Sequence, residues 1–195
     1  MALMTLGFLI GAGTAGTALA HAHVFLVDTI EVVFSGPQVT ALKLRWAFDE
    51  LFSDGMFSDF DTNGDRSFDA VEVDAIRAVS VESMKEFGYF THVWVDGELT
   101  KSFADVALNV VSEGNIVIYE WAITLAKPVD PSQNKLEISI FDDSYFVDVV
   151  LYMPNPVKLQ AAPGSCSYKV AEDETKAYYY GSIYPEVISL TCSSQ

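Results

Sequence analysis

The chain has 195 residues and about half of them are hydrophobic, which is enough for the buried core of one domain. Its formal net charge is −16. Such acidity argues against binding to a phosphate backbone, which needs clustered Lys and Arg, and it raises the concentration of cations around the protein. We therefore expect no nucleic-acid partner, whereas cations are plausible ligands.

The first twenty residues are the first segment with a recognisable pattern. Residues 1–20 carry no charged side chain and end in Ala18-Leu19-Ala20, which is typical of a signal-peptidase site. The sequence therefore predicts a signal peptide over 1–20, a periplasmic or secreted protein, and a mature chain that starts at His21. The alternative is an uncleaved membrane anchor, since the run approaches the ~20 apolar residues that span a bilayer.

Alternating and helical patterns follow in chain order. Residues 24–34 and 39–46 alternate as strands, and the first strand places Val24, Leu26, Ile30, Val32 and Phe34 on its buried face. A short helix is predicted from Phe48, Leu51, Phe52, Met56 and Phe57, and a second over 69–87 from Val71, Ile76, Val79, Val81 and Met84. Further strands are predicted near 89–95, 103–111, 115–125, 135–141, 145–153, 167–170 and 187–192. This order predicts a mainly β fold, an antiparallel β-sandwich in a single domain over 21–195, with an EF-hand-like helix-loop-helix inserted at about 47–87.

A twelve-residue segment between the two predicted helices fits the calcium loop of an EF-hand. The oxygen ligands would come from Asp61, Asn63 and Asp65 at positions 1, 3 and 5, Ser67 at 7, Asp69 through water at 9, and Glu72 at 12. Calcium needs such a set because it is a hard ion that takes six to eight oxygens. Arg66 departs from the motif, because position 6 normally needs Gly and a positive charge there opposes calcium. The alternative is an acidic turn without metal.

The predicted mature amino terminus is the second candidate metal site. It reads His21-Ala22-His23, and the chain holds three histidines in all. A free amine, two backbone amides and the imidazole of His23 would make a square-planar site that suits Cu(II) or Ni(II). Alternatively, both imidazoles could bind Zn(II) with a carboxylate from a neighbouring strand. Solvent-exposed histidines at a frayed end are the third reading.

Three other groups are candidate ligands. His92 shares strand parity with Phe90 and Trp94, which favours core packing over metal binding. Asp142, beside Asp143, could complete the histidine site, although paired acids at a strand end are more often a solvated turn. A carboxylate of Asp49-Glu50 could do the same. No nucleophile or cofactor motif is present, so we expect no enzymatic activity.

Cys166 and Cys192 are the two cysteines of the chain. Two cysteines in an exported protein usually pair, so a structural disulfide is predicted in preference to a thiolate metal site or reactive thiols.

Several motifs along the chain resemble those of a bacterial family catalogued as domain of unknown function 1007. The motifs are His21-Ala22-His23-Val24-Phe25, Arg45-Trp46-Ala47-Phe48-Asp49-Glu50, Asp61-Thr62-Asn63-Gly64-Asp65, Lys85-Glu86-Phe87-Gly88-Tyr89-Phe90-Thr91, Pro128-Val129-Asp130-Pro131 and Phe141-Asp142-Asp143-Ser144-Tyr145-Phe146. Members of that family are described as periplasmic components of an uncharacterised ABC-type transport system. The resemblance implies a metal-handling role associated with nickel, cobalt or zinc transport. It also implies that Gly commonly stands where this chain has Arg66.

The leading hypothesis is therefore an exported protein that captures a transition-metal ion, Ni, Co, Zn or Cu, for or alongside a membrane transporter. Its ligands would be His21, His23 and Asp142, with a structural calcium loop elsewhere. One alternative is a copper-dependent redox enzyme with an amino-terminal histidine brace. The other is a calcium-stabilised interaction module without a transition metal. The sequence leaves open which metal and which transporter are involved, and the oligomeric state.

Overall fold

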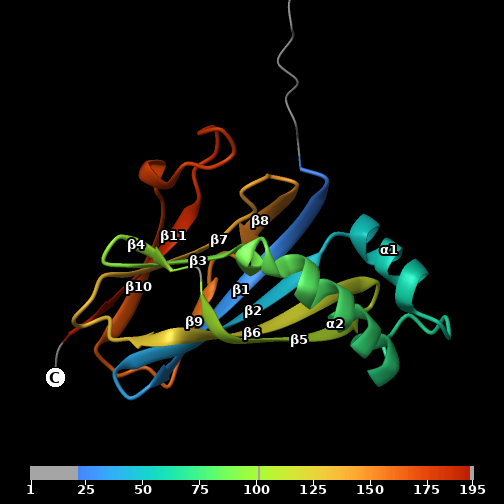
Figure 1. Cartoon of the computed structure of the whole chain (residues 1–195), viewed down its shortest axis with the longest axis horizontal. Coiled ribbons are helices and arrows are strands. Elements are labelled where there is room, and N and C mark those ends of the chain that lie inside the picture. The colour runs from blue at the N-terminus through green and yellow to red at the C-terminus, as the bar shows by residue number, and fades with distance from the viewer. Residues whose placement is uncertain (1–21, 101, 194–195) are drawn as a thin grey trace, which may run out of the picture.

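A computed structural model of the chain describes residues 22–100 and 102–193. The predicted signal peptide and His21 lie outside these ranges. Within them, two β-sheets and a pair of helices enclose a common hydrophobic core (Figure 1). The predicted mainly β, sandwich-like fold is confirmed.

The larger sheet, sheet A, has six strands. They are β1 (Val24–Ser35), β2 (Gln38–Phe48), β5 (Phe103–Glu113), β6 (Ile116–Val129), β8 (Val147–Leu151) and β9 (Val157–Gln160). Their order is β5-β6-β2-β1-β8, and β9 pairs with the second half of β1. Burial along β1 alternates as predicted, so its even-numbered residues face the core and its odd-numbered residues face outward. His23, which immediately precedes the strand, is exposed as well.

The smaller sheet, sheet B, has five strands in the order β10-β11-β7-β3-β4. They are β3 (Thr91–Val95), β4 (Glu98–Thr100), β7 (Leu136–Ile140), β10 (Cys166–Glu172) and β11 (Glu186–Cys192). All pairs in sheet B are antiparallel, but β8 and β9 run parallel to β1 in sheet A. The parallel pairing arises because the chain crosses from β7 back to sheet A beside the start of β1, where Val24 pairs with Val147.

The helices α1 (Glu50–Phe60) and α2 (Ala70–Lys85) cover the part of sheet A that sheet B leaves open (Figure 1). Polar contacts attach both helices to β6. The hydroxyl of Ser53 in α1 accepts from the backbone N–H of Val117 at 3.0 Å, and Ser80 in α2 lies 3.0 Å from the hydroxyl of Tyr119. Two short 3₁₀ turns, η1 (Gly88–Phe90) and η2 (Glu174–Lys176), complete the elements.

The buried faces of the helices match the prediction in part: Met56, Phe57 and Ile76 are buried as expected. Three residues assigned to the apolar faces, Leu51, Val71 and Val79, are 80%, 76% and 59% exposed, so that part of the prediction is wrong. The buried apolar residues are Met56 and Phe57 in α1 and Val73 and Ile76 in α2. Each helix contacts the sandwich along a narrow stripe, so apolar residues outside that stripe remain exposed.

An aspartate lies in the middle of the core. Asp28 sits on the inward face of β1, opposite Trp46 of β2, and is completely buried. Burial raises the pKa of its carboxyl well above the usual range, although the backbone N–H groups of Arg45 and Thr29 partly offset this. No described donor reaches hydrogen-bonding geometry with either carboxylate oxygen, and the indole N–H groups of Trp46 and Trp121 are likewise without a described acceptor.

Cys166 of β10 lies directly opposite Cys192 of β11, and the two form the predicted disulfide. Among the described residues, no helix is both long and apolar enough to cross a membrane.

Candidate functional site

The segment Asp61–Glu72 folds as a compact loop between α1 and α2, held by its own acidic side chains. The carboxylate of Asp61 accepts from the backbone N–H groups of Gly64 at 2.7 Å and Arg66 at 2.8 Å. Arg66 has a φ of +60°, the left-handed conformation that position 6 of an EF-hand loop requires. The loop thus has the predicted turn although a non-glycine residue makes it.

Glu72 joins the two ends of this loop. One carboxylate oxygen accepts from the backbone N–H and the hydroxyl of Thr62, both at 2.7 Å, and the other accepts from the backbone N–H of Asp69 at 3.0 Å. These donors, the N–H of Asp69 first, hold the pKa of Glu72 below its usual range. Asp69 in turn caps α2 by accepting from the N–H groups of Val71 and Glu72, so positions 9 and 12 form a capping box.

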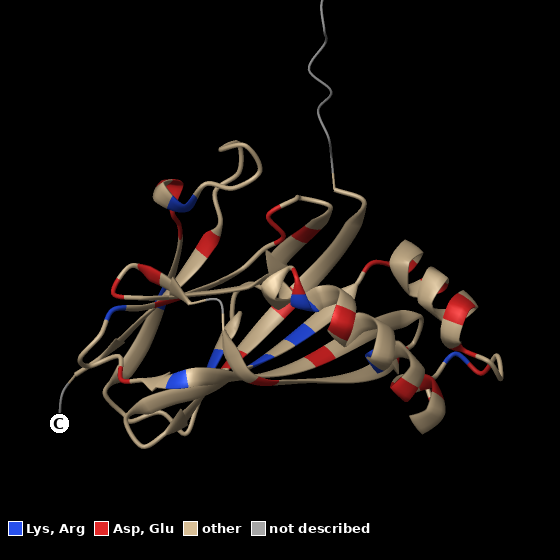
Figure 2. Cartoon of the chain, in the orientation of Figure 1, with Lys and Arg blue, Asp and Glu red and all other residues tan. Residues whose placement is uncertain are grey.

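The guanidinium of Arg66 points away from the loop carboxylates. It pairs with Asp54 of α1 at 2.6 Å and lies 4.5 Å from the ring centroid of Phe57. That ring is stacked on Phe68 of the loop. The positive charge is therefore directed at α1, which weakens the electrostatic objection to calcium that the sequence raised. Figure 2 shows acidic residues spread over both helices and the loop between them.

The described residues contain no preformed metal-binding site. In the ranges 22–100 and 102–193, no group of three or more His, Cys, Asp or Glu side chains is placed to hold a metal ion. Calcium binding at the loop would require the carboxylates of Asp61 and Asp65 to exchange backbone N–H donors for the ion. Asp65 accepts from the N–H and the hydroxyl of Ser67, both at 2.8 Å, and these bonds lower its pKa.

The second candidate site lies at the end of the sandwich where β1 and β8 begin (Figure 1). His23 is exposed just before β1. Its backbone N–H donates to the carbonyl of Phe146 at 2.9 Å, and its ring centroid lies 5.1 Å from that of Phe146. The other predicted ligand of this terminus, His21, lies outside the described residues. The beginning of β1 is therefore attached to the turn that connects β7 to β8.

Asp142 holds that turn together. It is buried, and its carboxylate accepts from the backbone N–H groups of Ser144, Phe146 and Val147 at 2.9–3.0 Å and from the hydroxyl of Ser144 at 2.8 Å. A metal ion would have to displace these donors. Asp143, by contrast, has a side chain that is 78% exposed. Of the two adjacent acids, the one proposed as a ligand from sequence is therefore the less accessible.

His92 of β3 reaches the same turn. Its ring is stacked on Phe141 with centroids 3.7 Å apart and a 5° interplanar angle, and it also stacks on Trp94 at 5.8 Å. Nδ1 lies 3.2 Å from the carbonyl oxygen of Phe90, and Nε2 lies 3.6 Å from a carboxylate oxygen of Asp143. Strand parity correctly predicted the aromatic packing, but it gave no sign of the contact with Asp143.

The acids beside the first helix are engaged elsewhere. The carboxylate of Asp49 accepts from the backbone N–H of Phe25 at 2.7 Å and from that of Phe52 at 2.9 Å. It thereby caps α1 and extends the pairing of β1 beyond the end of β2. Asp49 is thus a structural link, and its neighbour Glu50 is an exposed residue in the first turn of α1.

A cleft of about 540 Å³ opens beside His92. Its lining includes His92, Trp94, Phe141, Asp143, Lys176 and Tyr178. Burial, followed by nearby acids of which Asp148 is the strongest, raises the pKa of Tyr178 to about 12, so its hydroxyl stays protonated. The cleft therefore combines an aromatic wall with the imidazole of His92 and the exposed carboxylates of Glu86 and Asp143.

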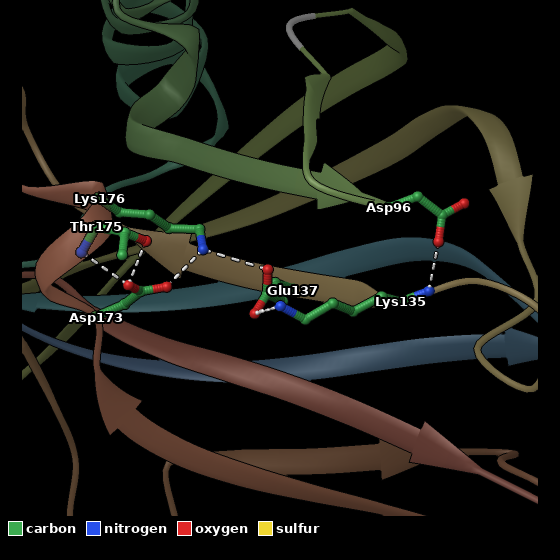
Figure 3. Close-up of polar contacts among 6 residues, drawn as sticks. All are labelled: Asp96, Lys135, Glu137, Asp173, Thr175 and Lys176. Atoms are coloured by element: carbon green, nitrogen blue, oxygen red, sulfur yellow. Dashed lines mark hydrogen bonds and ion pairs between the residues drawn. The ribbon is translucent and has the colours of Figure 1, made fainter.

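An ion-pair network lies beside sheet B (Figure 3), and one of its members, Lys176, lines this cleft. Glu137, which is 4% exposed, pairs with Lys135 at 2.7 Å and with Lys176 at 3.2 Å. Lys176 also lies 4.9 Å from the ring of Trp94 and 2.6 Å from Asp173, whose pKa it lowers to about 2. No sequence pattern indicates this network, because its members come from residues 135–137 and 173–176, which are far apart in the chain. It fastens η2 over sheet B and so supports the wall of the cleft.

Comparison with known proteins supports the family resemblance that the sequence motifs indicate. The family model described as "Protein of unknown function (DUF1007)" matches residues 6–185. The chain is also 26% identical over 145 residues to "Uncharacterized 15.5 kDa protein in trpE 3'region" from Spirochaeta aurantia, an alignment that covers 71% of this chain and 99% of that protein. Since the family match spans most of the sequence, this chain belongs to the DUF1007 family.

Proposed function

We propose that the protein is an exported metal-binding protein that captures a transition-metal ion, Ni, Co, Zn or Cu, for or alongside a membrane transporter. The observation that carries this proposal is the turn Phe141–Phe146. It contacts His23 at one end and His92 at the other, so histidines from distant parts of the sequence reach one end of the sandwich. Imidazoles beside carboxylates are typical ligands of these metals.

Two further features support an exported cation-binding protein. The Cys166–Cys192 disulfide is typical of oxidising compartments such as the periplasm. The net charge of −16 attracts cations to the surface over the range of a Debye length. Both features would serve a protein that collects a dilute metal ion outside the cytoplasm.

Isothermal titration of protein that begins at His21 tests this function. We expect Zn(II), Ni(II) or Cu(II) to bind with a Kd of about 1 μM or tighter, and the double variant His21→Ala plus His23→Ala to lose at least about tenfold in affinity, or about 1.4 kcal/mol. Absence of binding to the wild type, or equal binding to the double variant, would contradict the proposal.

A structural calcium ion at Asp61–Glu72 is the second part of the proposal. It is favoured by the left-handed backbone at Arg66 and by the outward direction of its guanidinium. Calcium that binds the folded loop alone would stabilise the native state by mass action. We therefore expect calcium to raise the melting temperature, and variants at Arg66, described in the Discussion, measure this effect.

A further inference from the structure

We infer that a cluster of tyrosines at one end of the sandwich is a docking surface for a protein partner that presents arginine or lysine side chains. We call this cluster the tyrosine surface, and it consists of Tyr145, Tyr178, Tyr179 and Tyr180 with the carboxylates of Asp143 and Asp148 near them. The inference goes beyond the proposed metal binding and does not depend on it.

Two segments that are distant in the sequence bring the four rings together. Tyr145 belongs to the turn before β8, and the other three tyrosines precede β11 (Figure 1). The ring centroid of Tyr145 lies 6.5 Å from that of Tyr178 and 5.5 Å from that of Tyr179, and Tyr179 lies 5.3 Å from Tyr180. Tyr178 also packs on the buried Phe141, with centroids 4.4 Å apart. The rings therefore form one continuous aromatic surface that is anchored on the core.

The backbone of the 178–183 segment presents these rings in a fixed conformation. The carbonyl of Tyr178 accepts from the N–H of Gly181 at 3.1 Å, and its N–H donates to the carbonyl of Ile183 at 2.9 Å. Between them, Tyr179 and Tyr180 have φ values of +45° and +57°, in a turn where Asn and Gly are the usual residues. Such a backbone is unfavourable for bulky side chains, and strained positions of this kind cluster at functional sites. Here the strained turn leaves Tyr180 96% exposed.

The charges around the tyrosine surface favour a cationic partner. Burial, followed by the negative charges of nearby acids with Asp148 the strongest, raises the pKa of Tyr178 to about 12. In the described part of the chain, no Lys or Arg forms an ion pair with Asp143 or Asp148. Partial burial also raises the pKa of Asp148, and a carboxylate that has lost part of its water gains more from a nearby cation than a fully hydrated one does.

The neighbouring cleft shows the same chemistry within the chain. The Nζ atom of Lys176 lies 4.9 Å from the ring centroid of Trp94, 2.6 Å from Asp173 and 3.2 Å from Glu137. This lysine thus combines an aromatic ring with carboxylates, which is the combination that the tyrosine surface offers to a partner. Arginine suits such a surface best, because its guanidinium stacks on aromatic rings and pairs with carboxylates in a bidentate manner. Tyrosine and arginine are also the residues that contribute most to the affinity of protein interfaces.

Binding of a fluorescent, capped octapeptide of alternating Gly and Arg, followed by anisotropy, tests the inference. We expect a Kd of about 100 μM or tighter in about 150 mM NaCl, which screens general attraction to the acidic protein. The same peptide with citrulline in place of Arg keeps the planar side chain without the charge and should bind at least about tenfold more weakly. EDTA in the buffer makes the result independent of any metal site.

Two pairs of variants locate the binding. Tyr179→Ala plus Tyr180→Ala should weaken it at least about fivefold, whereas Tyr184→Ala, which removes another exposed tyrosine outside the cluster, should change the Kd less than about twofold. Asp148→Asn should weaken binding about three- to tenfold, and Asp59→Asn, which removes the same charge from an exposed position of α1, less than about twofold.

Several results would overturn the inference. It is wrong if the Arg peptide does not bind, if the citrulline peptide binds equally well, or if each control variant weakens binding as much as its partner variant does. It is also wrong if maltoheptaose, a neutral oligosaccharide, binds through Tyr179 and Tyr180 and the Arg peptide does not. Should the double tyrosine variant not fold, the comparison of Asp148→Asn with Asp59→Asn decides the question.

Discussion

The Asp61–Glu72 loop and the Phe141–Val147 turn are both acidic, yet they differ in where their partners come from. In the loop, the carboxylates of Asp61, Asp65 and Glu72 are bonded within the same twelve residues. In the turn, Asp142 is bonded locally in the same way, but Asp143 meets His92 from another strand. A carboxylate that accepts hydrogen bonds from neighbouring residues fixes the backbone conformation. An exposed carboxylate beside an imidazole from a distant part of the sequence is available to a ligand.

The largest effect that tests this comparison is expected within the turn itself. Asp142→Ala should lower the free energy of unfolding by about 2–4 kcal/mol, since it removes a charged acceptor and leaves several turn donors without a partner. Asp143→Ala, at the next position, should change it by less than about 0.5 kcal/mol. Urea unfolding of the two variants measures both values. Equal losses would show that the two acids do not have the separate roles assigned here.

The next effect concerns Asp28, a buried carboxylate with which no described donor makes a hydrogen bond of good geometry. Because burial raises its pKa in the folded state, its contribution to stability is fully present below the unfolded pKa, near 3.9, and is lost as the pH rises through the folded value. Asp28→Asn cannot ionise, so at pH 7 it should be more stable than the wild type by about 1–3 kcal/mol.

Thermal unfolding between pH 4 and pH 8 checks this prediction. The advantage of Asp28→Asn should shrink towards pH 4, where the wild-type carboxyl is protonated. The exposed Asp59, changed to Asn, serves as the control and should show no such dependence. If Asp28→Asn and the wild type have parallel pH profiles, Asp28 is not a neutral carboxyl in the folded protein.

The smallest effect concerns the strained backbone of the loop. Arg66→Gly and Arg66→Ala both lose the contacts with Asp54 and Phe57, so their difference isolates the cost of a φ of +60°. We expect the Gly variant to be more stable than the Ala variant by about 1 kcal/mol and to gain more in melting temperature from calcium. Identical melting curves, with and without calcium, would mean that the loop neither stores this strain nor binds the ion.

The sequence by itself determined the features whose causes are local. The alternation along β1 follows from the two-residue period of a strand, and the loop follows from carboxylates that reach backbone N–H groups two to five residues away. The disulfide also followed, since a chain with two cysteines leaves one pairing. These features depend on spacing along the chain, which the sequence shows directly.

Only the tertiary structure decided which side chains meet. Asp142 and Asp143 are identical neighbours, and their different roles depend on which one the turn directs inward. His92 looked like a packing residue because strand parity predicts on which face of the strand a side chain lies. It does not predict which side chains of other segments lie beside it. The faces that the helices bury were likewise set by packing against sheet A. Contacts between distant segments depend on how the sheets and helices pack, and no local pattern in the chain encodes that arrangement.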